Sequence, residues 1–135
     1  MADKVVLVTG ASAGIGRSCA DLLAERGWTV VGASRRGTAG PGWRGLVMDV
    51  DDDASVRDGV ASVLSEHTRI DALLACAGWG LAGAAEQTTL SDAKAQMETN
   101  FWGAVRVTHE VLPVFRRQGG GRVVFMSSIG GVLGI

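Results

Sequence analysis

A glycine-rich segment, Thr9-Gly10-Ala11-Ser12-Ala13-Gly14-Ile15-Gly16-Arg17, follows a short apolar run and precedes residues with helical spacing. Glycines at a turn from a strand to a helix suit the binding of a pyrophosphate. Gly10 permits a tight turn, Gly14 lets the backbone approach the phosphates, and Gly16 lets the helix pack closely. Backbone N–H groups, the positive helix end and the Ser12 hydroxyl would donate to the anion. The segment predicts a dinucleotide site; the alternative is a glycine-rich turn without a ligand.

Two arginines stand about 20 residues further on, where dinucleotide-binding folds place the residue that reads the ribose. A site specific for NAD would offer a carboxylate to the 2′-hydroxyl, but this sequence offers Ser34-Arg35-Arg36. A guanidinium pairs with a 2′-phosphate through charge-assisted, often bidentate hydrogen bonds. The sequence therefore predicts NADP as the cofactor. NAD is the alternative, in which the two arginines are only the solvated end of a strand.

Short apolar runs alternate with amphipathic segments, and these elements must position the two candidate sites. The runs that read as buried strands are 5–8, 29–34, 46–48, 70–75 and 123–126. The longest helical segment carries a largely apolar face, made of Met97, Phe101, Ala104, Val105, Thr108, Leu112 and Phe115. Alternating strands and helices predict an α/β fold, a doubly wound parallel sheet of the Rossmann type with five strands in the order 3-2-1-4-5. Residues 1–135 would form one NAD(P)-binding domain, with no helix after the last strand.

The composition argues against several other classes of function. Thirteen basic and 14 acidic residues give a formal net charge of −1, which does not favour a nucleic-acid partner. The first apolar run, Val5 to Val8, is too short for a signal peptide or a membrane span, so we expect a cytoplasmic protein without a membrane partner. Cys19 and Cys76 lack metal-ligand spacing, so we expect reduced thiols and no metal.

From Val5 to Ile135 the chain resembles the short-chain dehydrogenase/reductase family. The family's glycine motif, Thr-Gly-x-x-x-Gly-x-Gly, is matched by Thr9–Gly16, and its Asp-Val pair by Asp49-Val50. Of its Asn-Asn-Ala-Gly motif, Ala75-Cys76-Ala77-Gly78 keeps only the second half. Its Asn-x-x-Gly motif and its Gly-Arg-Val-Val motif followed by Ser-Ser are matched at 100–103 and 121–128. The resemblance implies hydride transfer between NADP(H) and an alcohol/carbonyl pair.

The resemblance also implies roles for single residues. Ser128, with Ser127 as the alternative, would hydrogen-bond the substrate carbonyl or hydroxyl, and Asn100 would hold a water of the proton relay. Asp49 and Val50 would flank the adenine, and Ala77 and Gly78 would pass close to the cofactor ribose. The pyrophosphate and 2′-phosphate would be bound by Gly10, Ser12, Gly14, Ile15, Gly16, Ser34, Arg35 and Arg36.

The family's acid/base pair, a tyrosine and a lysine in a Tyr-x-x-x-Lys motif, has no counterpart in this sequence. The 135 residues contain no tyrosine, and the only lysines are Lys4 and Lys94. His109 cannot substitute, because it would lie about 13 Å along a helix from Asn100, and His67 belongs to the opposite half. We therefore expect a C-terminally incomplete part of a longer reductase. Its last strand, 123–126, would be an unpaired apolar edge that favours self-association, and we expect a homo-oligomer.

Two further functions stay open beside an oxidoreductase that acts on a small-molecule alcohol or carbonyl substrate. One is a truncated, catalytically inactive dinucleotide-binding module, which the missing tyrosine favours. The other is a flavodoxin-like flavin binder, against which the arginines at the ribose position argue.

Overall fold

Five strands and the helices between them alternate along the chain in a computed structural model that describes residues 4–133. The main elements are β1 (Val5–Thr9), α1 (Gly14–Glu25), β2 (Thr29–Ser34), β3 (Arg44–Val47), α2 (Asp53–His67), β4 (Ala72–Ala75), α3 (Leu90–Met97), α4 (Ala104–Gln118) and β5 (Arg122–Phe125). Shorter helical turns span Ala85–Gln87 and Ile129–Gly131, and a π-helix, Glu98–Gly103, joins α3 to α4.

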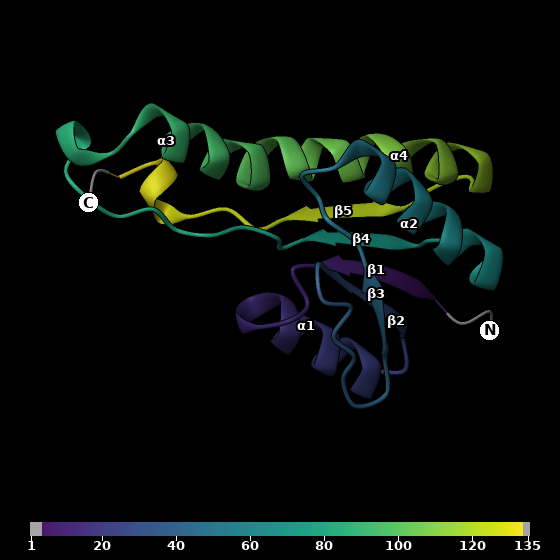
Figure 1. The fold of residues 1–135 in the computed structure, drawn as a ribbon. Coiled ribbons are helices and arrows are strands. Elements are labelled where there is room, and N and C mark those ends of the chain that lie inside the picture. Colours follow the sequence, from purple (N-terminus) through teal and green to yellow (C-terminus); the bar gives the residue numbers. More distant parts are fainter. Residues whose placement is uncertain (1–3, 134–135) are drawn as a thin grey trace.

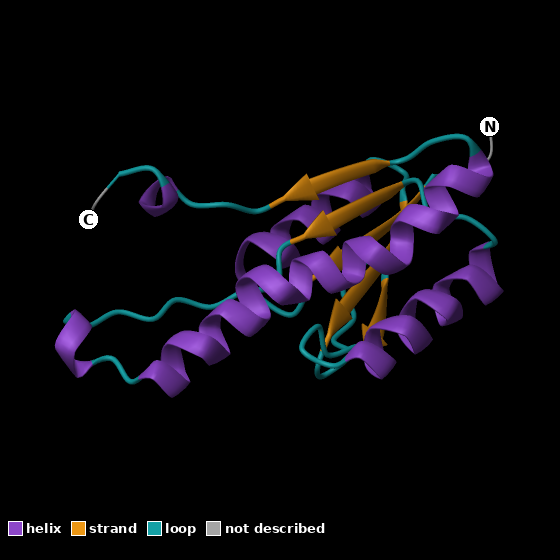
Figure 2. Ribbon diagram, turned by 90° about the horizontal axis from the view of Figure 1, so that it is seen from above, coloured by secondary structure: helices purple, strands orange, loops and turns teal. Residues whose placement is uncertain are grey.

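The strands form one parallel sheet in the order β3-β2-β1-β4-β5, which confirms the predicted topology. β1 lies in the middle, where Val6 is in register with Val30 of β2 and with Ala72 of β4. Helix α1 covers one face of the sheet, and α2 and α4 cover the other (Figures 1 and 2). Because all the strands are parallel, their carboxyl ends lie along one edge of the sheet, beside the start of α1.

Every side chain of β1 is buried, because helices cover both faces of the strand. Successive side chains of a strand point to opposite faces. Leu7 accordingly packs in a cluster with side chains of α2 and α4, whereas Val6 and Val8 pack in a second cluster on the α1 side. The core is thus divided by the sheet into two layers.

The helical region before β5 buries a different face from the one that the sequence predicts. Its buried side chains are Val107, Val111, Val114 and Phe115. Of the predicted face, Phe115 is buried and Ala104 and Thr108 are half-buried, but Met97, Phe101, Val105 and Leu112 are exposed. The prediction was wrong for these four residues because two neighbouring stripes of this region are both apolar at helical spacing, and periodicity alone does not say which one meets the sheet.

Strand β5 is an edge of the sheet and is paired only with β4. Val124 and Phe125 are 49% and 56% exposed, so the predicted apolar edge is present in the structure. Unpaired edges of this kind are templates for pairing with another chain. Within residues 4–133, no helix combines the length and the apolar character that crossing a membrane requires.

Asp71 joins the starts of β1 and β4. Its carboxylate accepts hydrogen bonds from the backbone N–H of Val5 at 2.8 Å and from Arg69 Nε at 2.9 Å. Arg69, together with the Val5 N–H, holds the pKa of the Asp71 carboxyl below its usual value. The stabilisation is therefore complete above the unfolded-state pKa of about 3.9 and is lost as pH falls through the lower folded-state pKa.

Asp71→Asn is expected to lower the free energy of unfolding at neutral pH by about 1–3 kcal/mol, since a charged acceptor is lost. The difference from wild type should shrink as pH falls below about 4, because the wild-type carboxylate is then protonated. Urea unfolding across this pH range measures it, with Asp58→Asn on the exposed side of α2 as the control. If the difference in free energy of unfolding between Asp71→Asn and wild type stayed constant with pH, the stabilising role of the Asp71 carboxylate would be contradicted.

Candidate functional site

The turn from β1 to α1 is built so that glycine is required at specific positions. Gly10 and Gly14 have φ angles of +68° and +56°, which side chains rarely tolerate. A Cβ at Gly10 would lie 2.8 Å from the backbone N and Cα of Ala77, so the turn touches the segment after β4. A Cβ at Gly16 would overlap the Gly10 carbonyl, so the helix packs directly on the turn.

The amino end of α1 is open on the side where a phosphate would bind. Its N-cap, Ala13, provides no side-chain hydrogen bond, and the first turn carries no acidic residue. A Cβ at Gly14 would meet no atom within 4 Å. The first N–H groups of a helix lack intrahelical partners and carry partial positive charge. The donor set and the open space therefore fit a pyrophosphate.

A cavity of about 450 Å³ lies at the carboxyl edge of the sheet, next to this turn. Eight of the predicted cofactor residues line it: Gly10, Ser12, Ser34, Arg35, Asp49, Val50, Ala77 and Gly78. Gly14, Ile15, Gly16, Arg36, Asn100 and Ser128 are not among its lining residues. The structure thus brings the glycine turn, the ribose-reading position and the segments after β3 and β4 into one cavity.

Thr9 ties the ends of β1 and β4 together beneath this cavity. Its buried hydroxyl accepts hydrogen bonds from the backbone N–H groups of Cys76 and Ala77, both at 3.1 Å. These bonds fix the segment that faces Gly10. The sequence predicts no role for Thr9 of its own, although its place at the head of the glycine motif is a usable signal.

Thr9→Val preserves the shape of the side chain but leaves two backbone N–H groups without an acceptor. We expect the free energy of unfolding to fall by about 2–4 kcal/mol, the lower part of the range for two unsatisfied donors at about 1–3 kcal/mol each, because Cys76 and Ala77 are half-buried. Thr9→Ser is the matched control, because it keeps the hydroxyl and loses only a methyl group. Denaturant unfolding compares the two variants, and equal free energies of unfolding would show that the Thr9 hydroxyl does not hold the segment of Cys76 and Ala77 in place.

Arg35 and Arg36 follow β2 directly and are both exposed. Arg35 lines the cavity, and the preceding residue, Ser34, is buried and accepts a hydrogen bond from the Thr38 N–H at 3.3 Å through its Oγ. Arg17, in the first turns of α1, is paired with Asp21 at 3.2 Å. Of these three arginines, Arg35 is thus the one whose position suits a cavity ligand best.

Asp49 and Val50 form the wall of the cavity that follows β3. The Asp49 carboxylate accepts from the Asp51 N–H at 3.0 Å, and the Asp49 N–H donates to Ser55 Oγ at 2.9 Å. Val50 is buried, and its side chain leaves no room for a Cβ at Gly103. This wall is therefore held by the start of α2 and by the π-helix.

Asn100 lies in the π-helix and holds the segment after β4. Its Oδ1 accepts from the Trp79 N–H and its Nδ2 donates to the Trp79 carbonyl, both at 2.9 Å. The Trp79 indole N–H in turn donates to Thr99 Oγ1 at 3.3 Å. π-helical turns are often found at functional sites. Trp79 and Thr99 line the cavity and were not predicted; neither belongs to a motif with a recognisable spacing.

Ser128 follows β5 and caps the short turn Ile129–Gly131. Its Oγ accepts from the Gly130 N–H at 3.1 Å, so its own hydroxyl hydrogen is available for another acceptor. The residue is exposed. This leaves it accessible to a substrate at the carboxyl edge of the sheet.

Residues 4–135 match the family model described as short chain dehydrogenase. The chain belongs to this family. A 3-ketodihydrosphingosine reductase of Bacteroides thetaiotaomicron is 43% identical over 100% of this chain and 51% of its own length. A serine 3-dehydrogenase of Agrobacterium fabrum is 32% identical over 92% of this chain and 53% of its own length.

Among solved structures of the family, a short-chain dehydrogenase from Streptomyces avermitilis superposes with a TM-score of 0.91. It is 37% identical, and the match covers 97% of this chain and 51% of that one. The short-chain dehydrogenase chain described here thus spans about half the length of the curated relatives that it matches. Its homologues are oxidoreductases with the same Rossmann-type sheet, which confirms the predicted fold and enzyme class.

Proposed function

We propose that this short-chain dehydrogenase uses NADP(H) to interconvert an alcohol and a carbonyl group. The observation that carries the proposal is a single cavity that holds both the glycine turn of Gly10 and the guanidinium-bearing residue Arg35. The first is suited to a pyrophosphate and the second to a 2′-phosphate. NAD is the second candidate, and a carboxylate in place of Arg35 would have favoured it.

Three parts of the cavity would hold three parts of the cofactor. The N–H groups of the turn, with Ser12, would bind the pyrophosphate, and Arg35 with Arg36 would pair with the 2′-phosphate. Asp49 and Val50 would flank the adenine, and Ala77 with Gly78 would lie along a ribose. Gly14, Ile15 and Gly16 would contribute through the amino end of α1.

When bound, the nicotinamide accepts or supplies the hydride. Ser128 would donate its hydroxyl hydrogen to a carbonyl oxygen of the substrate, because its Oγ already accepts from Gly130. Asn100 would keep the Trp79 segment in place through its side-chain amide. That Asn100 also holds a water of a proton relay stays a prediction.

The substrate is proposed from the names of the two relatives, both of which place the reaction at carbon 3. We propose a small molecule with a carbonyl or hydroxyl group at that position. 3-Ketodihydrosphingosine in the reductive direction and serine in the oxidative direction are therefore the first probes. That the protein forms a homo-oligomer stays a prediction.

Calorimetric titration with NADPH, with NADH as the control, tests the cofactor. Clear preference for NADPH is expected, and equal or stronger binding of NADH would contradict the proposal. Turnover of either probe above the rate without protein tests the chemistry. A dinucleotide-binding module without catalysis is the alternative function, and binding without turnover would support it.

A further inference from the structure

Trp43 is buried although it ends the connection between β2 and β3, most of which is exposed. It is 6% exposed and packs in the cluster of Val6 and Val8 on the α1 side of the sheet. Its indole lies against Gly32 of β2 and Gly40 of the connection, so closely that a methyl group at either glycine would overlap the ring. The ring is thus held between the sheet and the connection.

The indole N–H of Trp43 reaches across to α1. It donates to Asp21 Oδ1 at 2.6 Å, and Asp21 Oδ2 accepts from Arg17 Nε at 3.2 Å. The Arg17 guanidinium lies 5.3 Å from the centroid of the Trp43 ring, within reach of a cation–π contact. The Trp43 and Arg17 hydrogen bonds hold the pKa of the Asp21 carboxyl below its usual value. We call these three residues the Trp43 cluster.

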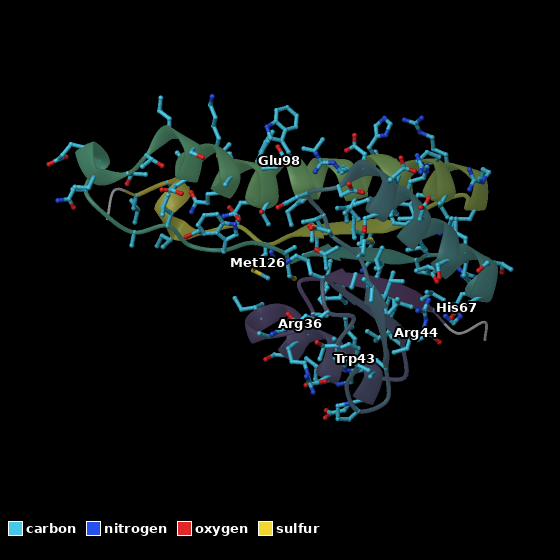
Figure 3. The ribbon with its side chains drawn as sticks, in the orientation of Figure 1. Arg36, Trp43, Arg44, His67, Glu98 and Met126 are labelled. Carbon is cyan, nitrogen blue, oxygen red and sulfur yellow. The ribbon has the colours of Figure 1, made fainter. Side chains whose placement is uncertain are left out.

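The segment between Ser34 and Trp43 is short and is closed at both ends. At one end, the Gly37 N–H donates to the Ser34 carbonyl at 3.1 Å. At the other, Gly40 and Trp43 exchange backbone hydrogen bonds of 3.3 and 3.2 Å. Arg36 and Trp43 lie on the α1 side of the sheet in Figure 3. Only residues 37–42 therefore separate the two arginines from Trp43 along the chain.

We propose that the Trp43 cluster positions Arg35 and Arg36, and thereby sets how strongly the protein discriminates a 2′-phosphate from a 2′-hydroxyl. The inference rests on the proposed use of NADP. Trp43 is a positioning residue, since it is not among the residues that line the cavity. A guanidinium pairs well with a phosphate only in a defined orientation, so a loosened connection weakens this contact and leaves those to the 5′-phosphate unchanged.

The test compares two ligands that differ only in the 2′-phosphate, adenosine 2′,5′-bisphosphate and 5′-AMP. Trp43→Phe keeps an aromatic ring in the core but has no N–H donor. We expect the ratio of the two affinities to fall about tenfold or more, the size of one hydrogen bond to a charged acceptor, with the 5′-AMP affinity within twofold of wild type. Glu25→Ala, which removes an exposed carboxylate from the same helix, should leave both affinities unchanged.

Asp21→Ala provides a second test that does not depend on the folding of Trp43→Phe. A part-exposed position in a helix tolerates alanine, so this variant should fold. Hydrogen exchange at the Gly37 and Thr38 amides should become at least about tenfold faster in it. In the Asp21→Ala background, Trp43→Phe should cause no further fall in the ratio, since the bond is already absent.

The possible results distinguish a failure of the proposed cofactor from a failure of the proposed role of the Trp43 cluster. A wild-type protein that does not prefer the bisphosphate would overturn the proposed cofactor and this inference with it. A wild-type preference that survives unchanged in Trp43→Phe, or exchange rates that are unchanged in Asp21→Ala, would overturn the inference alone.

Discussion

Replacement of Arg35 by aspartate is expected to change the cofactor preference of the protein from NADPH to NADH. Arg35 lines the cavity at the end of β2 and is exposed toward a ligand. Hydrogen bonds to a charged group contribute about 1.5–3 kcal/mol each, so the loss of a bidentate pair should weaken NADPH binding about 100-fold or more. The new carboxylate would also repel the 2′-phosphate and could accept a hydrogen bond from a 2′-hydroxyl.

Calorimetric titration of both cofactors against both proteins measures this change. Arg35→Ala separates the two causes, because it removes the pairing without adding repulsion; NADPH should bind about 100-fold more weakly, a smaller loss than in Arg35→Asp, and NADH as before. Arg26→Asp, at the exposed end of α1, makes the same change in net charge away from the cavity. A loss of NADPH affinity in Arg26→Asp as large as in Arg35→Asp would point to net charge rather than to a specific contact.

Gly10→Ala is expected to have the largest effect on stability. The new Cβ would lie 2.8 Å from the backbone of Ala77, and neither backbone can yield, because Thr9 holds the facing segment. The positive φ of 68° adds strain. The left-handed conformation costs about 1–2 kcal/mol and overpacking about 1–3 kcal/mol. A loss of about 2–5 kcal/mol is a large part of the stability of a typical domain.

Gly14→Ala is the matched comparison, because its φ is also positive but its Cβ would meet nothing within 4 Å. It should cost only about 1–2 kcal/mol of stability while weakening the binding of NADPH, since the methyl group enters the space left for the phosphates. Denaturant unfolding and calorimetry, made on both variants, therefore separate the two glycines. Equal losses of stability would refute the assignment of Gly10 as the closely packed one.

The parts of this fold that could be predicted are those set by local pattern. The parallel direction of the strands follows from their alternation with helices, and the glycine turn is recognisable because its motif and its context agree. An acidic stretch is typical of the start of a helix, and Asp52 caps α2 by accepting from the Ser55 N–H at 2.6 Å. Each of these features depends on residues close together in the chain.

The contacts that hold the site in place could not be predicted, because they join distant residues. Asp21 and Trp43 are 22 residues apart, and Asn100 reaches back 21 residues to Trp79. The spacing of such residues along the sequence does not indicate that they meet in the folded protein. The stripe Met97, Phe101, Val105 and Leu112 was misassigned for a related reason, since the choice between two apolar faces is made by the sheet against which the helix packs.

The central place of β1 in the sheet has a consequence for synthesis on the ribosome. β1 is made early, yet one of its two partners, β4, begins only at Ala72. At about 5–20 residues per second, the strand waits roughly 3–13 s with one edge unpaired and its apolar side chains only partly covered. During this interval the elements already made are α1, β2, β3 and, towards its end, α2, whereas α4, which also covers this face of the sheet, is made only after β4. Nascent chains stalled before residue 72 should therefore bind chaperones through Val5–Thr9, and chains that include β4 should release them.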